Sequence, residues 1–143
     1  IEFTIGLFCM EQFDGELINH LKKKTDIQGA KKFKMNKNGL TIIFSDGRKI
    51  LIENKELNAF VRYNCRFCTD FTSMYADISV GSAGSPSGWT TVIIKSDIGR
   101  SIYYGALRSG FIVENPKSPN MRAIERLSSK KMEQGKKINL HSN

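Results

Sequence analysis

The sequence predicts an α+β fold, a single domain of small mixed or antiparallel sheets with helices at the periphery. Three observations support this prediction. A chain of 143 residues suits one domain and can bury a core without disulfides or metals. Short apolar stretches are separated by Asn38-Gly39 and Asp46-Gly47, pairs that are typical of hairpin turns. Apolar residues at helical spacing recur before and after these stretches, so helices flank the strands.

The amino-terminal half predicts one strand, two helices and a three-stranded hairpin unit. Runs of apolar residues indicate the strands, and an aspartate ahead of an apolar helix face indicates a helix cap. In order, the predicted elements are a strand over 2–10, a helix capped by Asp14 with Leu17, Ile18 and Leu21 on one face, strands over 31–35, 39–44 and 49–52, and a short helix over 55–60. A loop that carries Cys65 and Cys68 is expected to follow this helix.

The carboxy-terminal half predicts two strands around a glycine-rich loop, followed by helices. Pro116 and Pro119 indicate a linker, so we divide the chain into a domain over 1–115 and a carboxy-terminal helix with a basic tail over 116–143. In order, the predicted elements are strands over 75–80 and 90–94, a helix over 98–107, a strand over 111–113, and a last helix that Asn120 caps and Gly135 ends.

The chain is basic, with a net charge of +8 from 22 Lys and Arg against 14 Asp and Glu. The lysines are scattered over several predicted elements, so we interpret them as a solvated surface and do not expect nucleic acid as a partner. No apolar run approaches the roughly 20 residues that cross a bilayer. The given residues show no export-signal pattern, and three cysteines do not suit a secreted disulfide framework, so we expect a cytoplasmic protein. The chain begins at Ile1 inside a predicted strand, so we expect it to be a piece of a longer polypeptide.

Cys65 and Cys68 form a C-x-x-C motif, the spacing at which two thiolates can reach one metal ion. Zinc ribbons, rubredoxin-like irons and iron–sulfur clusters all use this spacing. A zinc ribbon needs a second pair, and only Cys9 remains. A thioredoxin-type pair is the other alternative, although such a pair normally opens a helix directly after a strand. The motif therefore predicts a metal without identifying it.

The loop from Gly81 to Gly88 joins two predicted strands and is rich in glycine and serine. Glycines let a backbone approach a ligand closely, and serine hydroxyls are further donors to a phosphate. The loop matches neither a P-loop nor a dinucleotide-binding fingerprint, so a mobile hairpin connection is the alternative. Trp89, which follows the loop, can stack on a flat ring or fill the core. Because the two histidines lie far from the other reactive side chains in sequence, no hydrolase triad is expected.

Four motifs together resemble the carboxy-terminal domain of the beta subunits of coenzyme F420 hydrogenases and dehydrogenases. The resemblance runs from Ile1 to about Glu114, with the motifs in the family's order and spacing. The wider family includes the input subunit of F420H2 dehydrogenase, an F420-linked formate dehydrogenase subunit and a plant chlorophyll reductase. The motifs are Ile5-Gly6-Leu7-Phe8-Cys9, Cys65-x-x-Cys68-x-Asp70-Phe71, Ala76-Asp77-Ile78-Ser79-Val80-Gly81 and Gly88-Trp89-Thr90-Thr91-Val92-Ile93.

The resemblance implies a flavoprotein oxidoreductase subunit in which FAD exchanges a hydride with coenzyme F420 or a similar carrier. It implies a [4Fe-4S] cluster that passes electrons to other oxidoreductase subunits or to ferredoxin. Cys9, Cys65 and Cys68 would be cluster ligands, with Asp70 or a residue outside this chain as the fourth. The implied flavin-binding residues are Gly81, Ser82, Gly84, Ser85, Gly88, Trp89, Thr90 and Thr91.

Two further expectations concern this loop and its surroundings. Lys95 and Arg100 are the basic residues nearest the loop in sequence and are candidates to bind cofactor phosphates. A valine at Gly84 is expected to lower flavin occupancy and leave the fold intact, because a loop between strands contributes little to the core.

The alternative function is a zinc-stabilised, non-enzymatic binding module with a basic surface.

Overall fold

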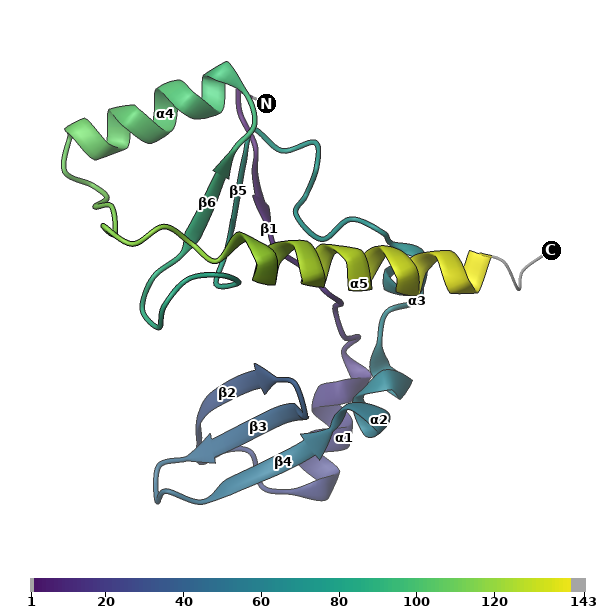
Figure 1. The fold of residues 1–143 in the computed structure, drawn as a ribbon. Helices are drawn as coiled ribbons and strands as arrows, with labels where there is room; N and C mark the ends of the chain where they lie inside the picture. Colours follow the sequence, from purple (N-terminus) through teal and green to yellow (C-terminus); the bar gives the residue numbers. More distant parts are fainter. Residues whose placement is uncertain (1, 140–143) are drawn as a thin grey trace. The chain divides into compact units, whose positions relative to one another are not determined.

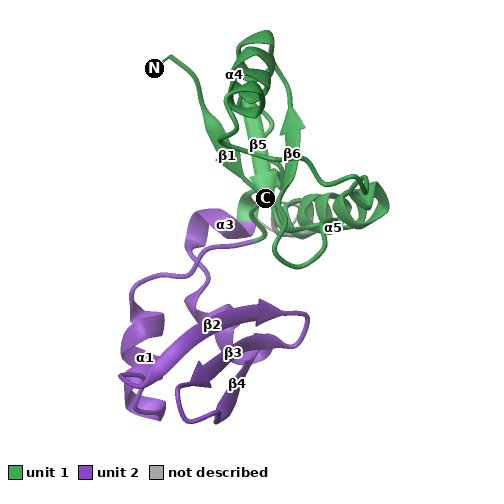
Figure 2. Cartoon of the chain, turned by 90° about the vertical axis from the view of Figure 1, so that its left-hand side faces the viewer, with its two compact units in different colours: residues 1–10, 67–143 green, residues 11–66 purple. Residues whose placement is uncertain are grey.

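The computed structural model describes residues 2–139, and it confirms the α+β prediction (Figure 1). The chain forms two compact units, one made of residues 1–10 and 67–143 and the other of residues 11–66 (Figure 2). No helix within the described residues is long and apolar enough to cross a membrane. The elements are β1 (Ile5–Leu7), α1 (Glu16–Lys24), β2 (Ala30–Asn36), β3 (Gly39–Phe44), β4 (Lys49–Glu53), α2 (Asn54–Leu57), the 3-10 turn η1 (Asn58–Phe60), α3 (Tyr63–Phe67), β5 (Ile78–Gly81), β6 (Thr91–Ile94), α4 (Asp97–Arg108) and α5 (Met121–Asn139).

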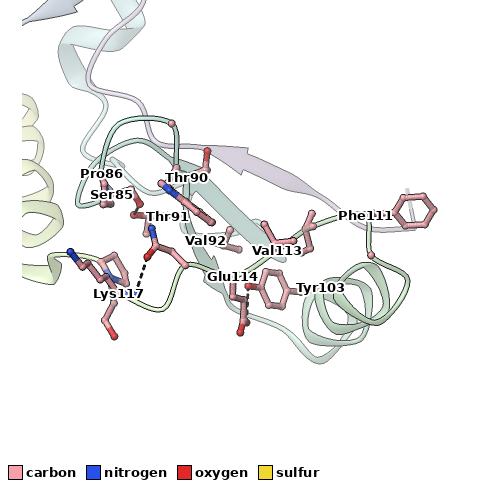
Figure 3. A pocket seen from close by; sticks show the side chains of 17 residues that line it. Ser85, Pro86, Thr90, Thr91, Val92, Tyr103, Phe111, Val113, Glu114 and Lys117 are labelled. Atoms are coloured by element: carbon pink, nitrogen blue, oxygen red, sulfur yellow. Dashed lines mark hydrogen bonds between the residues drawn. The ribbon is translucent and has the colours of Figure 1, made fainter.

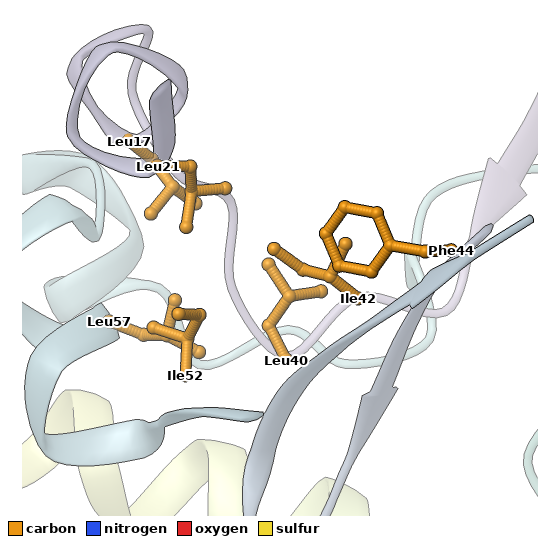
Figure 4. Packing of buried hydrophobic residues seen from close by; sticks show 7 residues of the cluster. All are labelled: Leu17, Leu21, Leu40, Ile42, Phe44, Ile52 and Leu57. Carbon is orange, nitrogen blue, oxygen red and sulfur yellow. The ribbon is translucent and has the colours of Figure 1, made fainter. Parts of the chain in front are cut away.

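The unit of residues 11–66 is a three-stranded antiparallel sheet, β2-β3-β4, with α1 and α2 packed on it. Side chains alternate along a strand, so every second residue of β3 points to the core, and Ile42 at its centre is fully buried. Gly47, in a left-handed conformation, makes the predicted turn between β3 and β4. The core consists of Leu17, Leu21, Leu40, Ile42, Phe44, Ile52 and Leu57 (Figure 4).

The two ends of this unit are hydrogen-bonded to each other. The backbone N–H of Arg62 donates to the carbonyl of Gln12 at 2.9 Å, and that of Asp14 donates to the carbonyl of Phe60 at 2.9 Å. Phe13 and Val61 form an isolated antiparallel bridge between the same two segments. Because its ends meet, the unit is closed by its own contacts.

The other unit is built on the sheet β1-β5-β6, in which β1 pairs in parallel with β5 and β5 pairs antiparallel with β6. In α4, Gly99 lies so close to this sheet that an added Cβ would be 2.4 Å from the carbonyl oxygen of Asp77. Ile124 of α5 is buried. Of these two helices, α4 packs on the sheet at Gly99, and α5 packs on the loop that follows β5, where Ile124 lies against Gly84.

Asp77 joins three elements of this unit. Its carboxylate accepts hydrogen bonds from the backbone N–H (2.8 Å) and hydroxyl (3.0 Å) of Thr4, ahead of β1. It also accepts a hydrogen bond of 2.6 Å from the hydroxyl of Ser96, whose oxygen in turn caps α4 at the N–H of Gly99. The Ser96 hydroxyl, then the two Thr4 donors, hold the pKa of Asp77 below its ordinary value. Asp77 is thus a structural junction rather than an acid–base group.

Three predicted elements differ in the structure. Residues 111–113 form no strand. Gly110 turns the chain back, and the N–H of Phe111 donates a hydrogen bond to the carbonyl of Ala106 at the end of α4. Gly135 does not end the last helix, which continues to Asn139, because this glycine packs inside the helix against another segment. Cys65 lies in α3 rather than in a loop.

Two other predictions at this end of the chain are confirmed. The helix over 98–107 is α4, and the side chain of Asn120 caps α5 by accepting from the N–H of Ala123 at 3.3 Å. Part of the predicted basic tail, residues 140–143, lies outside the described residues.

Replacing Asp77 by alanine should lower the melting temperature, because three donors lose their common acceptor. A depressed pKa means that the carboxylate stabilises the fold fully above its ordinary value of 3.8 and loses this effect as the pH falls towards the folded value. The difference in melting temperature between wild type and Asp77→Ala should therefore shrink in acid.

Asp77→Asn is the matched control, because its amide oxygen can still accept from one side of the junction. We expect an intermediate melting temperature. Equal melting temperatures for the wild type and the alanine variant at neutral pH would contradict this role.

Candidate functional site

The loop over residues 82–90, between β5 and β6, is held by hydrogen bonds to β6 and to the start of α5. The hydroxyl of Thr91, which is buried, donates to the carbonyl of Ala83 at 2.7 Å and lies 2.7 Å from the hydroxyl of Ser85. The carbonyl of Gly84 accepts from the N–H of Asn120, the cap of α5, at 2.8 Å. These bonds give the loop one defined shape beside the start of α5.

Gly81, the last residue of β5, and the two glycines of the loop have different surroundings. At Gly81 an added Cβ would be 2.3 Å from the ring of Phe8, and at Gly84 it would be 2.9 Å from the carbonyl oxygen of Asn120. Close packing within the chain thus accounts for both glycines. Gly88 has a left-handed backbone, with φ of +86°, and nothing within 4 Å of an added Cβ. Gly88 is therefore the glycine at which a ligand has room to approach.

A cavity of about 690 Å³ lies next to the loop, within this unit (Figure 3). One wall comes from the stretch 85–92 of the loop and β6, the other from the stretch 110–119, and Tyr103 of α4 contributes as well. Five of the eight predicted cofactor-binding residues line it, namely Ser85, Gly88, Trp89, Thr90 and Thr91. The volume is within the range of small-molecule sites, roughly 300–1,000 Å³.

The cavity combines an apolar surface with a few polar groups. Phe111 is 85% exposed and Val113 is 73% exposed, although both are large and apolar. The hydroxyl of Tyr103 donates to the carboxylate of Glu114 at 3.0 Å. Burial first, then this hydrogen bond and the charge of Glu114, raise the pKa of Tyr103. Lys117 contributes a positive charge at the rim. Such a surface suits a flat ring system that carries an anionic group.

The basic residues expected near the cofactor are not in this cavity. The ammonium of Lys95 donates to the carbonyls of Thr72 and Ser73, at 2.7 and 2.8 Å. Burial lowers its pKa, partly opposed by the charge of Asp70. Arg100 lies 3.9 Å from Asp97 on an exposed turn of α4. The basic residue that lines the cavity is Lys117, and neither a motif nor spacing in the sequence indicates it.

The cysteines are distributed over both units. Cys9 and Cys68 belong to the unit of residues 1–10 and 67–143, and Cys65 belongs to the other. The backbone N–H of Cys9 donates to the carbonyl of Phe71 at 2.9 Å, so the two cysteine segments of the first unit lie side by side. Asp70 caps a turn, because its carboxylate accepts from the N–H of Met74 at 2.8 Å.

Cysteine sulfur is the ligand that iron–sulfur clusters use, and the chain supplies three cysteines. The sulfur of Cys65 accepts a hydrogen bond from the N–H of Gln12 at 3.4 Å. Cys68 is exposed, and its thiol donates to the carbonyl of Asp70 at 3.6 Å. Among the described residues, neither unit gathers three His, Cys, Asp or Glu side chains in an arrangement for a metal ion. The ligand set Cys9, Cys65 and Cys68 stays a prediction.

Comparison with known proteins gives one consistent family. The family model for the C terminus of the beta subunit of coenzyme F420 hydrogenase/dehydrogenase matches residues 1–120. The chain is 29% identical to the beta subunit of coenzyme F420 hydrogenase of Methanosarcina barkeri, over 96% of this chain and 49% of that protein. It is 34% identical to a subunit of F(420)H(2) dehydrogenase of Methanosarcina mazei, over 89% of this chain and 38% of that protein.

A solved structure gives the same result. A chain of the F420-reducing [NiFe] hydrogenase complex from Methanosarcina barkeri matches with a TM-score of 0.85 and 29% identity, over 95% of this chain and 49% of that chain. The present chain thus spans about half the length, or less, of the relatives that it matches.

The contacts of Gly84 overturn the expectation that a side chain at this position leaves the fold intact. Gly84 and Gly88 both have a left-handed backbone, so alanine at either should cost about 1–2 kcal/mol of stability. At Gly84 the new Cβ would also press on the Asn120 carbonyl and on Ile124, 3.2 Å away. Urea unfolding should therefore show a larger loss for Gly84→Ala than for Gly88→Ala. Equal losses would mean that the loop does not pack on α5.

Proposed function

This chain belongs to the family formed by the carboxy-terminal part of coenzyme F420 hydrogenase/dehydrogenase beta subunits, and from this premise we propose that it is part of a flavin- and iron–sulfur-dependent oxidoreductase subunit. The subunit exchanges electrons between coenzyme F420, or a similar hydride carrier, and an iron–sulfur chain. The partners are other oxidoreductase subunits or ferredoxin. A cytoplasmic location stays a prediction from the sequence.

The observation that supports this proposal most is the cavity between the loop and the 110–119 segment. Its apolar side chains, Trp89 and Phe111 among them, can pack on a flavin or deazaflavin ring and keep water from it. The open backbone at Gly88 and the ammonium of Lys117 are suited to a cofactor phosphate. A bound flavin would supply the step between two-electron and one-electron chemistry.

The cysteines supply the second part of the proposal. Cys9, Cys65 and Cys68 would hold an iron–sulfur cluster, with Asp70 or a residue outside this chain completing the set. Thiolates hold such clusters in electron-transfer proteins, and the cluster would accept and release single electrons. The role of this chain is to supply the thiolates and to hold their segments in place.

The full-length protein, purified without air, should absorb in the flavin and iron–sulfur regions. Cys65→Ser should lose iron and acid-labile sulfide, because a serine hydroxyl is a poor ligand for this metal. Iron, sulfide and flavin are measured per mole of folded protein. A colourless protein with stoichiometric zinc would contradict the proposal and favour a metal-stabilised binding module.

Phe111→Ala should weaken flavin binding about tenfold, the effect of losing about 1.4 kcal/mol of ring packing. Because Phe111 is 85% exposed, its truncation should leave the melting temperature of the flavin-free protein unchanged. Tyr75, which is 95% exposed and lies outside the cavity, is the matched control, and Tyr75→Ala should bind flavin normally. If Phe111→Ala bound flavin as tightly as Tyr75→Ala, the flavin would not lie in this cavity.

A further inference from the structure

The carboxy-terminal helix α5 carries a buried lysine that contacts a cysteine segment. Lys131 is only 1% exposed, although Lys130 beside it is exposed. Its ammonium donates a short hydrogen bond to the carbonyl of Met10, the residue that follows Cys9. Burying an ammonium is costly unless it is hydrogen-bonded, so this bond fixes where α5 and the Cys9 segment meet.

One helical turn further on, the same face of α5 meets the other cysteine segment of this unit. An added Cβ at Gly135 would be 2.9 Å from the carbonyl oxygen of Phe67, 3.0 Å from that of Cys68 and 2.7 Å from Thr69. Residues four apart share a helix face, so Lys131 and Gly135 form one continuous contact stripe. Only a glycine lets the helix approach these carbonyls so closely.

We propose that α5 is a positioning helix for the iron–sulfur site, with Lys131 and Gly135 as its positioning residues. The inference rests on the function proposed above. The two cysteine segments are joined to each other through the N–H of Cys9 and the carbonyl of Phe71, and each is joined to α5. Segments that are ordered before the metal arrives cost less conformational entropy to gather around it, which raises metal affinity.

The test compares Gly135→Ala with Gly105→Ala. Both glycines lie inside helices, and nothing lies within 4 Å of an added Cβ at Gly105. Alanine is the better helix former, so Gly105→Ala should retain all of its iron and be at least as stable as wild type. Gly135→Ala should retain less iron per chain, because the new methyl group pushes α5 away from the Cys68 segment.

Lys131→Met is a second variant that keeps the volume of the side chain and removes the ammonium, with Lys130→Met as its control. A second readout needs no metal. The metal-free full-length protein is treated with iodoacetamide, and the alkylation rate of Cys9 is measured by peptide mass spectrometry. The alkylation rate of Cys65, in the other unit, is the reference. We expect an increase of about tenfold in Lys131→Met, which corresponds to about 1.4 kcal/mol of lost local protection, and no change in Lys130→Met.

The outcomes separate this inference from the proposed function. Unchanged iron content and unchanged Cys9 alkylation in both Gly135→Ala and Lys131→Met overturn the positioning role. A lower melting temperature with an unchanged alkylation rate of Cys9 also overturns the positioning role, because α5 would then only stabilise the fold. A wild-type protein without iron contradicts the proposed function, and a faster Cys9 rate in the variants would still show that α5 orders this segment.

Discussion

The buried stripe of α5 is the constraint that connects the loop beside the cavity with the segments of Cys9 and Cys68 in this unit. The start of α5 contacts the loop over 82–90. Gly84 packs on Ile124, and the carbonyl of Gly84 accepts a hydrogen bond from the N–H of Asn120, the cap of α5. Its later turns hold the cysteine segments through Lys131 and Gly135. From Ile124 to Gly135 a helix rises about 16 Å. One rigid element therefore sets the positions of both the loop that lines the cavity and the segments that carry Cys9 and Cys68.

The cavity depends on an irregular segment that returns from the end of α4. Gly110, with φ of +73°, reverses the chain, and the N–H of Phe111 satisfies the carbonyl of Ala106. The hydrogen bond between Tyr103 and Glu114 then ties the segment back to α4. Large apolar side chains stay exposed along it, which is unfavourable in the absence of a bound ligand or partner. The exposure fits a surface that binds a ring.

The sequence predicts the parts of the fold that local patterns determine. The hairpins at Asn38-Gly39 and Asp46-Gly47 and the helix over 98–107 follow from turn chemistry and periodicity, and the structure confirms them. The predicted strand over 111–113 is wrong, because its apolar residues are exposed at a cavity and not paired in a sheet. The predicted stop at Gly135 is wrong too, since a sequence cannot show that Phe67 and Cys68 lie against this glycine. Lys117 and Tyr103 reach the cavity only through tertiary structure.

The proposed function requires the cavity beside Gly88 to hold a redox-active ring. The most direct measurement is a structure of the full-length, flavin-loaded protein in the presence of its reduced hydride carrier. We expect density for a flavin or deazaflavin ring between the loop over 82–90 and the segment over 110–119, in contact with Trp89 or Phe111. A protein with both cofactors bound and this cavity filled only by solvent would contradict it.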